Sequence, residues 1–426
     1  MAFRTLFSHK PFLFYFWARS FSEFAYQMAA VAVGWQVYSL TRSAFDLGMV
    51  GLVQFIPTAV LVFAAGHAAD RYDRRRVVQV CQIVEGLTAT LLAWASFAGH
   101  LNVREIFAAV AVLGTAAAFE SPAAAALLPG VAPEGMLQKG TAFSAGGFQA
   151  AMICAPALGG LAYARSPGAP YTVMAVFWLL AGMLNGAIKL ARPGLDQPGL
   201  DQPGLDQPGL DQPRLGEPGT GKEPPTLAAL FAGVGFVRRN PAILGTISLD
   251  LFAVLLGGAT ALLPIYARDI LHTGPWGLGV LRSAPAVGAL LMTAVLARHA
   301  LTRRVGMRMF QAVIVFGLAT LVFAVSHLIW LSLLALFIMG AADTVSVVIR
   351  TSLVQLRTPD EMRGRVGAVN FLFINASSQL GEFESGITAA LFGAMPAAVL
   401  GGVGTVAVAL LWMKLFPTLR NVERLE

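Results

Sequence analysis

The stretch GTISLDLFAVLLGG, residues 245–258, is apolar or small at nearly every position except Asp250. A run of about 20 apolar residues can cross the hydrocarbon core of a bilayer as a helix. An ionised carboxylate at mid-membrane costs about 2.5 to 3.5 kcal/mol on insertion scales, so Asp250 must face a partner, the protein interior or a water-filled cavity. The stretch therefore predicts a membrane helix that carries one acid with a structural or functional purpose.

The rest of the chain has the same apolar character. Of its 426 residues, 56% are hydrophobic and only 12% are charged, a balance outside the range of soluble globular domains. Segment length and apolar content predict an all-α, multi-pass membrane protein with twelve transmembrane helices, at 11–39, 45–69, 76–99, 104–128, 140–164, 170–191, 241–266, 276–299, 306–326, 328–350, 365–392 and 396–416.

The basic residues predict the orientation of these helices, because Lys and Arg collect on the cytoplasmic side of a membrane. With both termini cytoplasmic, 24 of the 30 Lys and Arg residues lie on that side, two lie within helices (Arg19 and Arg282), and four lie outside: Arg42, Arg104, Arg165 and Arg268. We therefore expect a cell membrane protein, of the bacterial inner membrane, with cytoplasmic termini. The net charge of +7 is spread over many short loops, so it does not indicate a nucleic-acid partner.

The chain divides after the sixth predicted helix. Residues 193–212 read PGLDQ four times and continue into PRLGEPGTGKEPP, a polar segment rich in Pro and Gly that buries too little to order itself. We expect an N-terminal half at 1–191, a flexible cytoplasmic linker at 192–225, and a C-terminal half at 226–426. The helical pattern at 226–240, with its basic end, predicts an amphipathic helix on the inner membrane surface.

Two loops repeat each other across this division. APEGMLQKGTAF at 132–143 aligns with TPDEMRGRVGAV at 358–369, at an offset of 226 residues. A chain of two similar six-helix halves would produce such an offset. We therefore predict two pseudo-symmetric halves.

The sequence GHAADRYDRRR at 66–76, between the second and third predicted helices, resembles the loop signature of the major facilitator superfamily. The matching residues are Gly66, Asp70, Arg71, Arg74 and Arg75, whereas Asp73 stands where the signature usually has glycine. The resemblance implies a latch whose charge contacts hold the cytoplasmic side in one conformation and release it in the other. A simple anchor of basic residues on the inner side is the alternative.

A finer resemblance covers nearly the whole chain. WQVYSLTRSAFDLGMVGLVQFIP at 35–57 and ESPAAAALLP at 120–129 are similar to the branch that contains bacterial enterobactin exporters and macrolide-efflux proteins. This resemblance implies proton-coupled export of drugs or siderophores. APALGG at 155–160 resembles an antiporter signature, in which Pro156, Gly159 and Gly160 match and Ala155 replaces a glycine.

The resemblance also implies that the first, fourth, seventh and tenth helices line a central cavity. Each of these helices carries one intramembrane acid: Glu23, Glu120, Asp250 and Asp343. Glu23 and Asp250 are 227 residues apart, within one residue of the loop offset, so they occupy corresponding places. We predict that the four acids face one aqueous cavity, where burial and mutual repulsion make protonation near neutral pH possible.

Asp250 has no base in its own helix before Arg268, which makes it the best candidate for a proton carrier or a substrate contact. A hydrogen-bonded structural acid between helices is the alternative. Glu23 follows Arg19 by four residues, so an ion pair on one helix face is equally open.

The two remaining acids also have structural alternatives. Asp343 could pair with Arg282, or with Arg350 across two helical turns, which is a long reach. Glu120 precedes Ser121 and Pro122, where a broken helix could satisfy it locally.

Several polar side chains in the predicted helices are expected to contact the substrate: Tyr26, Gln27, Gln54, Gln149, Asn370, Asn375 and Gln379. Glu382 and Glu384 are two further acids near the outer side. Cys81 and Cys154 both fall inside predicted helices as packing residues, so no disulfide is expected.

The sequence favours a secondary transporter over an enzyme or an ATP-driven pump. It contains no P-loop pattern, and its six histidines have no metal-ligand spacing. We predict a monomeric, proton-coupled exporter of a small amphipathic molecule, a siderophore or a drug, that works by alternating access without a cofactor. A lipid or lysophospholipid flippase of the same fold and a non-transporting receptor or scaffold are the alternatives.

Overall fold

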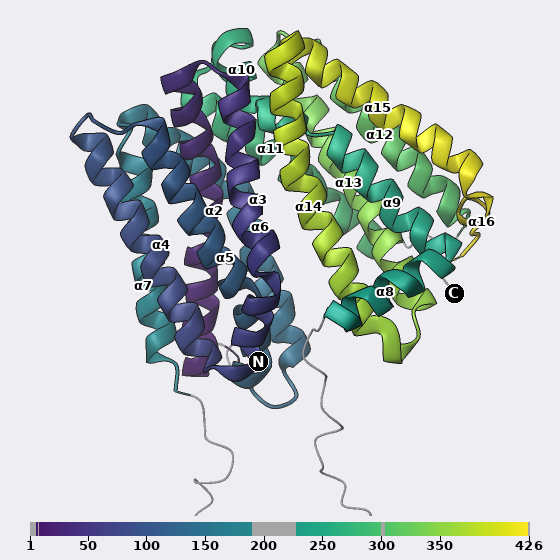
Figure 1. Cartoon of the computed structure of the whole chain (residues 1–426), viewed down its shortest axis with the longest axis horizontal. Helices are drawn as coiled ribbons and strands as arrows, with labels where there is room; N and C mark the ends of the chain where they lie inside the picture. Colours follow the sequence, from purple (N-terminus) through teal and green to yellow (C-terminus); the bar gives the residue numbers. More distant parts are fainter. Residues whose placement is uncertain (1–5, 7, 190–226, 300–302, 425–426) are drawn as a thin grey trace, which may run out of the picture.

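The computed structural model describes residues 6, 8–189, 227–299 and 303–424, and in these ranges the regular structure is entirely helical. The expected linker at 192–225 lies outside the described residues. The helices gather into two groups that lie side by side (Figure 1). We call them the N-terminal bundle and the C-terminal bundle. The end of the molecule where α7 ends and α8 begins is called the linker end, and the opposite end the far end.

The N-terminal bundle contains six long helices. They are α2 (Lys10–Thr41), α3 (Ala44–Arg71), α4 (Arg74–Phe97), α5 (Val103–Val131), α6 (Leu137–Arg165) and α7 (Ala169–Ala187). Three of them begin at side chains that satisfy free backbone N–H groups. Ser43 accepts from the N–H of Asp46 before α3, Asp73 accepts from the N–H of Arg75 before α4, and Asn102 forms a capping box with Glu105 before α5.

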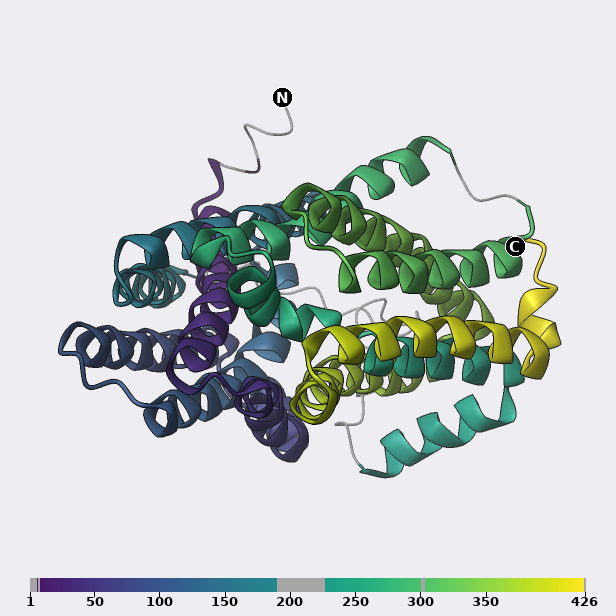
Figure 2. The same cartoon turned by 90° about the horizontal axis from the view of Figure 1, so that it is seen from above.

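The C-terminal bundle begins with α8 (Leu227–Arg239), which confirms the helix expected at 226–240. The long helices that follow are α9 (Pro241–Leu256), α11 (Gly274–Arg298), α12 (Val305–Ala324), α13 (Ile329–Arg357), α14 (Asp360–Phe392) and α15 (Ala394–Leu415), and the short α16 (Pro417–Arg420) follows α15. Viewed from above, α8 lies apart from most of the bundle, along its edge (Figure 2).

The span predicted at 241–266 is present as Pro241–Ile270, but its helix is interrupted. The α-helix ends at Leu256, and the chain continues through a 3₁₀ turn (Ala259–Leu262), the short α10 (Leu263–Ile265) and a π-helical turn (Tyr266–Ile270). The break falls at Gly257 and Gly258, and Gly258 packs closely against α14. A Cβ on Gly258 would lie 2.6 Å from the carbonyl oxygen of Gly381, so only glycine fits.

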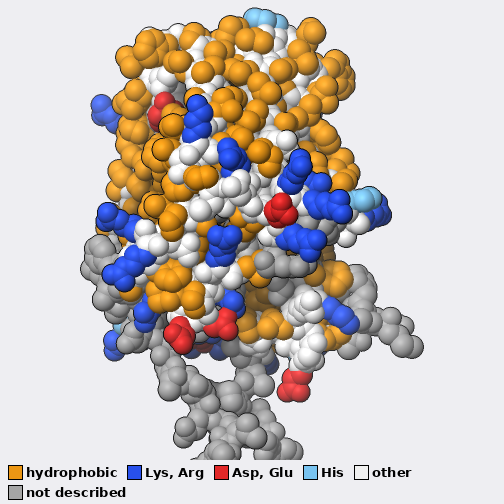
Figure 3. Space-filling view, turned by 90° about the vertical axis from the view of Figure 1, so that its right-hand side faces the viewer, with side chains coloured by type: hydrophobic (Ala, Val, Ile, Leu, Met, Phe, Trp, Pro, Cys, Tyr) orange, Lys and Arg blue, Asp and Glu red, His pale blue; other side chains and the backbone are white. Residues whose placement is uncertain are grey.

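Within the described residues, ten helices are long and apolar enough to cross a membrane. α2 and α14 are not among the ten, although they have 32 and 33 residues. Polar and charged side chains lower the mean hydropathy of both. Figure 3 shows apolar side chains over the upper part of one face of the molecule and Lys and Arg gathered over its lower part. The chain is therefore a multi-pass membrane protein by the length and composition of its helices.

The two bundles meet through backbone contacts at small residues. A Cβ on Gly160 of α6 would lie 2.4 Å from the carbonyl oxygen of Pro275, and a Cβ on Gly279 of α11 would lie 2.4 Å from that of Pro156. Gly48 of α3 and Gly386 of α14 make a second contact of the same kind. Glycine allows membrane helices to approach this closely, so these pairs set the distance between the bundles.

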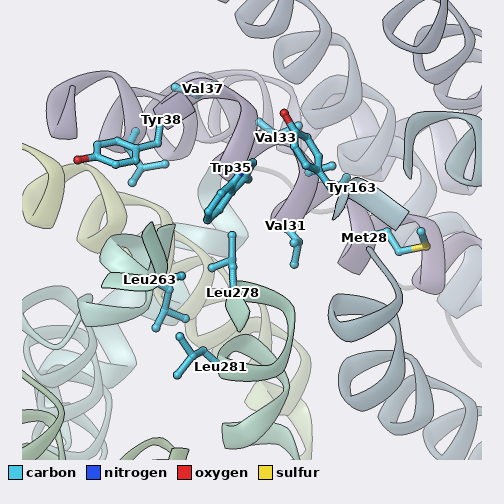
Figure 4. Packing of buried hydrophobic residues seen from close by; sticks show 14 of the residues in the cluster. Met28, Val31, Val33, Trp35, Val37, Tyr38, Tyr163, Leu263, Leu278 and Leu281 are labelled. Atoms are coloured by element: carbon cyan, nitrogen blue, oxygen red, sulfur yellow. The ribbon is translucent and has the colours of Figure 1, made fainter. Parts of the chain in front are cut away.

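Buried apolar and polar contacts join the bundles toward the far end. Figure 4 shows Trp35 of α2 next to Leu278 of α11, with Leu263 of α10 below them, and all three are buried in one apolar cluster. Tyr38 donates a hydrogen bond to Asp269, and Arg42 pairs with the same carboxylate at 3.0 Å. These contacts close the molecule at the far end.

Candidate functional site

A cavity of about 370 Å³ lies within the C-terminal bundle. Its walls come from α9, α12, α13 and α14, with residues 257–260 after α9 and Pro285 of α11. The charged side chains that line it are Asp250, Asp343, Arg350 and Glu382. Two of the four acids predicted to share a cavity are therefore brought together here.

Arg350 joins Asp250 and Asp343 into one cluster. Its Nη1 donates to Oδ1 of Asp250, and its Nη2 lies 3.7 Å from Oδ1 of Asp343. Asp250 and Arg350 are 7% and 8% exposed, so their charges are largely removed from solvent. We name Asp250, Asp343 and Arg350 the C-terminal cluster.

The partners of both acids are among the alternatives that the sequence left open. Asp250 has no base in its own helix but pairs with one on another helix, and Asp343 lies within ion-pair distance of Arg350, although a long reach was expected. The reason is that α9 packs against α13, which places an arginine 100 residues away beside Asp250. Arg282, the other partner considered for Asp343, lines a different cavity.

The C-terminal cluster has more acid than base. Two carboxylates face one guanidinium, so the cluster carries a charge of −1 when every group is ionised. The side chain of Asp343 is 47% exposed, whereas that of Asp250 is 10% exposed. A buried ion pair is costly unless it is well compensated, so this cluster can accept a proton or a cationic group from the cavity.

A second cavity, of about 240 Å³, lies between the two bundles. It is lined by most of the polar residues predicted to contact a substrate: Tyr26, Gln27, Gln54, Asn375 and Gln379. Arg282 and Glu382 add one charge of each sign, and Gln54 donates a hydrogen bond of 2.6 Å to Tyr26. Glu382 and Ser378 line both cavities, so the two spaces are neighbours. Asn370 lines the first.

Glu23 lies beside this region but lines neither cavity. It pairs with Arg19 at 3.9 Å and accepts a hydrogen bond of 2.9 Å from Gln27. The ion pair considered from the spacing of four residues is therefore present.

Glu120 is placed elsewhere, inside the N-terminal bundle. It is 5% exposed and accepts hydrogen bonds of 2.9 Å from Ser22 of α2 and Gln82 of α4. A single cavity shared by all four acids is therefore wrong, and so is satisfaction of Glu120 by the local backbone. Sequence reasoning also passed over its neighbour Glu85, although an acid in the middle of a predicted membrane helix was itself the signal.

Two further residues have structural partners. Gln149 of α6 donates a hydrogen bond of 2.9 Å to the carbonyl oxygen of Ala286 in α11 and lines neither cavity, so it joins the bundles. The carboxylate of Glu384 accepts from Thr388, one turn later on α14, at 2.8 Å.

The sequence profile of the Major Facilitator Superfamily matches residues 15–382, which is most of the chain. This protein belongs to the Major Facilitator Superfamily. Members of this family are transporters, so the chain is a transporter and not an enzyme.

Several relatives of this chain are named as exporters. The multidrug efflux pump Tap of Mycobacterium tuberculosis strain H37Rv is 26% identical over 374 residues, covering 84% of this chain and 82% of Tap. The enterobactin exporter EntS of Citrobacter koseri is 24% identical over 435 residues, covering 98% and 94%. Macrolide efflux protein A of Streptococcus pyogenes is 29% identical over 123 residues, covering 29% and 30%.

Solved structures of other transporters share the fold. A peptide transporter POT variant in complex with sulfate superimposes with a TM-score of 0.70 at 14% identity, covering 97% of this chain and 96% of that one. A bacterial homologue of the lysosomal transporter Spinster, inward-facing and occupied, gives 0.70 at 11% identity, covering 96% and 95%. At these identities the likeness shows the fold alone.

The superfamily loop between α3 and α4 binds the ends of other helices in its own bundle. Arg75 pairs with Asp73 at 2.7 Å and donates to the carbonyl oxygen of Ile188 at 2.7 Å, at the end of α7. Arg74 donates to the carbonyl oxygen of Ala126 in α5 at 3.0 Å. The hydrogen bonds from Arg75 lower the pKa of the Asp73 carboxyl below its usual range.

The other signature positions of this loop are Gly66, Asp70 and Arg71. The side chain of Asp70 lies outside the described residues, Arg71 is exposed, and Gly66 lies within α3. Asp73, which stands where the signature has glycine, pairs with Arg75.

The antiporter-like motif of α6 lies where the two bundles meet. Pro156 and Gly160 face α11, as described above, while a Cβ on Gly159 would meet Met28 of α2 at 3.3 Å. The motif therefore packs α6 against one helix of each bundle.

Proposed function

We propose that this chain is a proton-coupled exporter with twelve membrane-spanning helices in two pseudo-symmetric halves, in which α2 and α14 complete the set of spans. It works as a monomer in the bacterial inner membrane with both termini in the cytoplasm. The proton gradient is its energy source, and it needs no bound cofactor. The observation that carries the proposal is the C-terminal cluster beside a cavity, because intramembrane acids of this kind mark proton and substrate pathways.

The chemistry of the cluster supports coupling between a proton and a substrate. Arg350 is held by Asp250 while that carboxylate is ionised. Protonation of Asp250 removes its charge and weakens the pair, which frees Arg350 to bind the more exposed Asp343 or an anionic group of the substrate. A cationic substrate would compete with Arg350 for the same carboxylates. Proton and substrate thus act on one set of groups, which is the requirement for exchange.

The cavity between the bundles supports a small amphipathic substrate. Apolar side chains such as Leu113 and Trp178 form much of its wall, and amide and hydroxyl groups from Gln27, Gln54 and Asn375 supply hydrogen bonds. Ligand sites typically combine an apolar wall with a few placed polar groups. The relatives named as drug and siderophore exporters favour the same two substrate classes.

The contacts that join the bundles at the far end support alternating access. With the termini in the cytoplasm, the far end is the outer side. Release of substrate there requires Asp269 to leave Tyr38 and Arg42, and α6 to part from α11 at Gly160 and Gly279. These contacts form and break as a unit when the bundles rock about the central site.

Transport in everted vesicles with an acidic interior tests the proposal. Asp250→Asn should reduce uptake of a fluorescent amphipathic cation such as ethidium, or of a catecholate siderophore, about tenfold, which is about 1.4 kcal/mol. Asp360→Asn is the matched control, because Asp360 is 87% exposed at the linker end of α14. Unchanged gradient-driven uptake in Asp250→Asn would contradict the proposal, and flipping of a labelled lysophospholipid in the same vesicles would favour a flippase instead.

A further inference from the structure

A second group of buried acids lies inside the N-terminal bundle, away from the cavities described above. Glu85 of α4 and Glu120 of α5 are 2% and 5% exposed. Helices α2, α4, α5 and α7 pack together around them. We name Glu85 and Glu120 the N-terminal acid pair.

The hydrogen bonds around the pair run in one direction. Asn185 of α7 donates to Gln82 at 2.8 Å, and Gln82 donates to Oε1 of Glu120 at 2.9 Å. Ser22 of α2 donates to the same Oε1 at 2.9 Å. Glu120 is therefore the acceptor at the end of a chain of neutral donors, as expected for an ionised carboxylate in the protein interior.

Glu85 has a different environment. Glu85 follows Gln82 by three residues on α4, and Gln82 binds Glu120, so the Glu85 carboxyl group lies on the side of α4 that faces Glu120. Its Oε2 is buried without a partner among the described residues. Two ionised carboxylates are acceptors only, so they cannot hydrogen-bond to each other. A hydrogen bond between them requires a proton on one of the two.

The charges that face the pair do not remove this requirement. Arg19 of α2 is the cation that acts on Glu85, and its ion pair at 3.9 Å is with Glu23. Tyr15 of α2 and Cys81 of α4 lie in the same region, and both side chains are neutral at pH 7. One guanidinium thus stands against three carboxyl groups. A neighbouring like charge in a buried site makes it costly for both carboxyl groups to be ionised.

We infer that Glu85 and Glu120 form a second proton-binding site, in which the two carboxyl groups share one proton taken from solvent. This site goes beyond the proposed export function, because it is separate from the C-terminal cluster and requires no substrate. Helix α2 connects the acid pair to the cavity between the bundles. Its Ser22 binds Glu120, and its Tyr26 and Gln27 line that cavity. Movement of α2 during transport would change the hydrogen bonds of the pair and with them its hold on the proton.

Infrared difference spectroscopy of the purified protein in nanodiscs tests the inference without any transport assay. The wild type at neutral pH should show a C=O band of a protonated carboxylic acid that shifts on exchange into D₂O. Glu85→Gln should lose that band, because the glutamine amide can donate to Glu120 in place of the shared O–H and leave Glu120 ionised. The double variant Glu85→Gln with Glu120→Gln should lose the same single band and no other.

Two controls separate this result from the export proposal. Glu134→Gln, at an exposed acid between α5 and α6, and Asp250→Asn should both keep the band. A band that persists in Glu85→Gln, or two bands that are lost one with each carboxyl group, would overturn the shared proton. Glu85→Gln keeps the shape of the side chain, so the test stands even where Glu120→Gln fails to fold, which size-exclusion chromatography would reveal.

Discussion

The two groups of buried acids differ in what neutralises them. In the C-terminal bundle, Asp250 and Asp343 share Arg350, whereas in the N-terminal bundle Glu85 and Glu120 face neutral donors and each other. By the 226-residue offset of the repeated loops, the position that corresponds to Arg350 is Ala124. Ala124 is buried on α5 and brings no charge; its carbonyl oxygen accepts a hydrogen bond from Tyr15.

This difference teaches that buried acids with and without an arginine partner are suited to different exchanges. An acid held by an arginine beside a cavity can exchange its partner for a substrate group. An acid pair enclosed by helices and without its own cation can exchange only a proton. The difference can be tested by substituting, in each group, the side chain that the other members bind.

The largest effect is expected at Arg350. Arg350→Gln leaves Asp250 buried without its cation, and breaking a buried pair in this way typically costs about 3 to 5 kcal/mol of stability. The loss should appear as a lower Tm of the purified protein in detergent. Adding Asp250→Asn to the same chain removes the unpaired charge and should recover most of the loss. A double variant no more stable than Arg350→Gln would show that the pair is not the cause.

A smaller effect is expected within the N-terminal acid pair, and it should be unequal. Glu120→Gln turns an acceptor of two hydrogen bonds into a weaker one that also brings its own donors, so Ser22 and Gln82 lose their best partner. A buried donor left unsatisfied costs about 1 to 3 kcal/mol.

Glu85→Gln should cost less than Glu120→Gln, because the amide replaces a protonated carboxyl group of the same shape. Thermal unfolding of the two single variants, compared with Glu134→Gln, measures the inequality. Equal losses at both positions would argue against the different roles of the two acids.

The smallest effect is expected at Asp73, an acid with an arginine partner outside the membrane-spanning helices. Its pKa is lowered by the hydrogen bonds from Arg75, so its contribution to stability is present at neutral pH and is lost as the pH falls through that lowered pKa. Partly exposed pairs are worth less than about 1 kcal/mol. Asp73→Asn should therefore change the Tm little at pH 7. As the pH is lowered, the Tm of the variant should fall less steeply than that of the wild type. If the Tm of the variant falls with pH as steeply as that of the wild type, Asp73 does not contribute to the pH dependence of stability.

Much of the general plan could be predicted from local sequence. Helix positions follow from apolar length, and Ser43, Asp73 and Asn102 start their helices for reasons that act within a few residues. The pair of Arg19 and Glu23 follows from a spacing of four residues in a helix. The break after Leu256 was missed, although Gly257 and Gly258 were visible, because apolar content alone does not reveal close packing against α14.

The sequence by itself determined the class of protein, the order of its helices and the presence of acids inside them, because the bilayer imposes length and polarity on each segment separately. Only the tertiary structure decided which partner each acid has. Asp250 meets an arginine 100 residues away, Glu120 meets Ser22 and Gln82 on two other helices, and Gly160 meets Pro275 of the other bundle. Such partners depend on how helices pack against one another, and the spacing of residues along one helix carries no record of its neighbours.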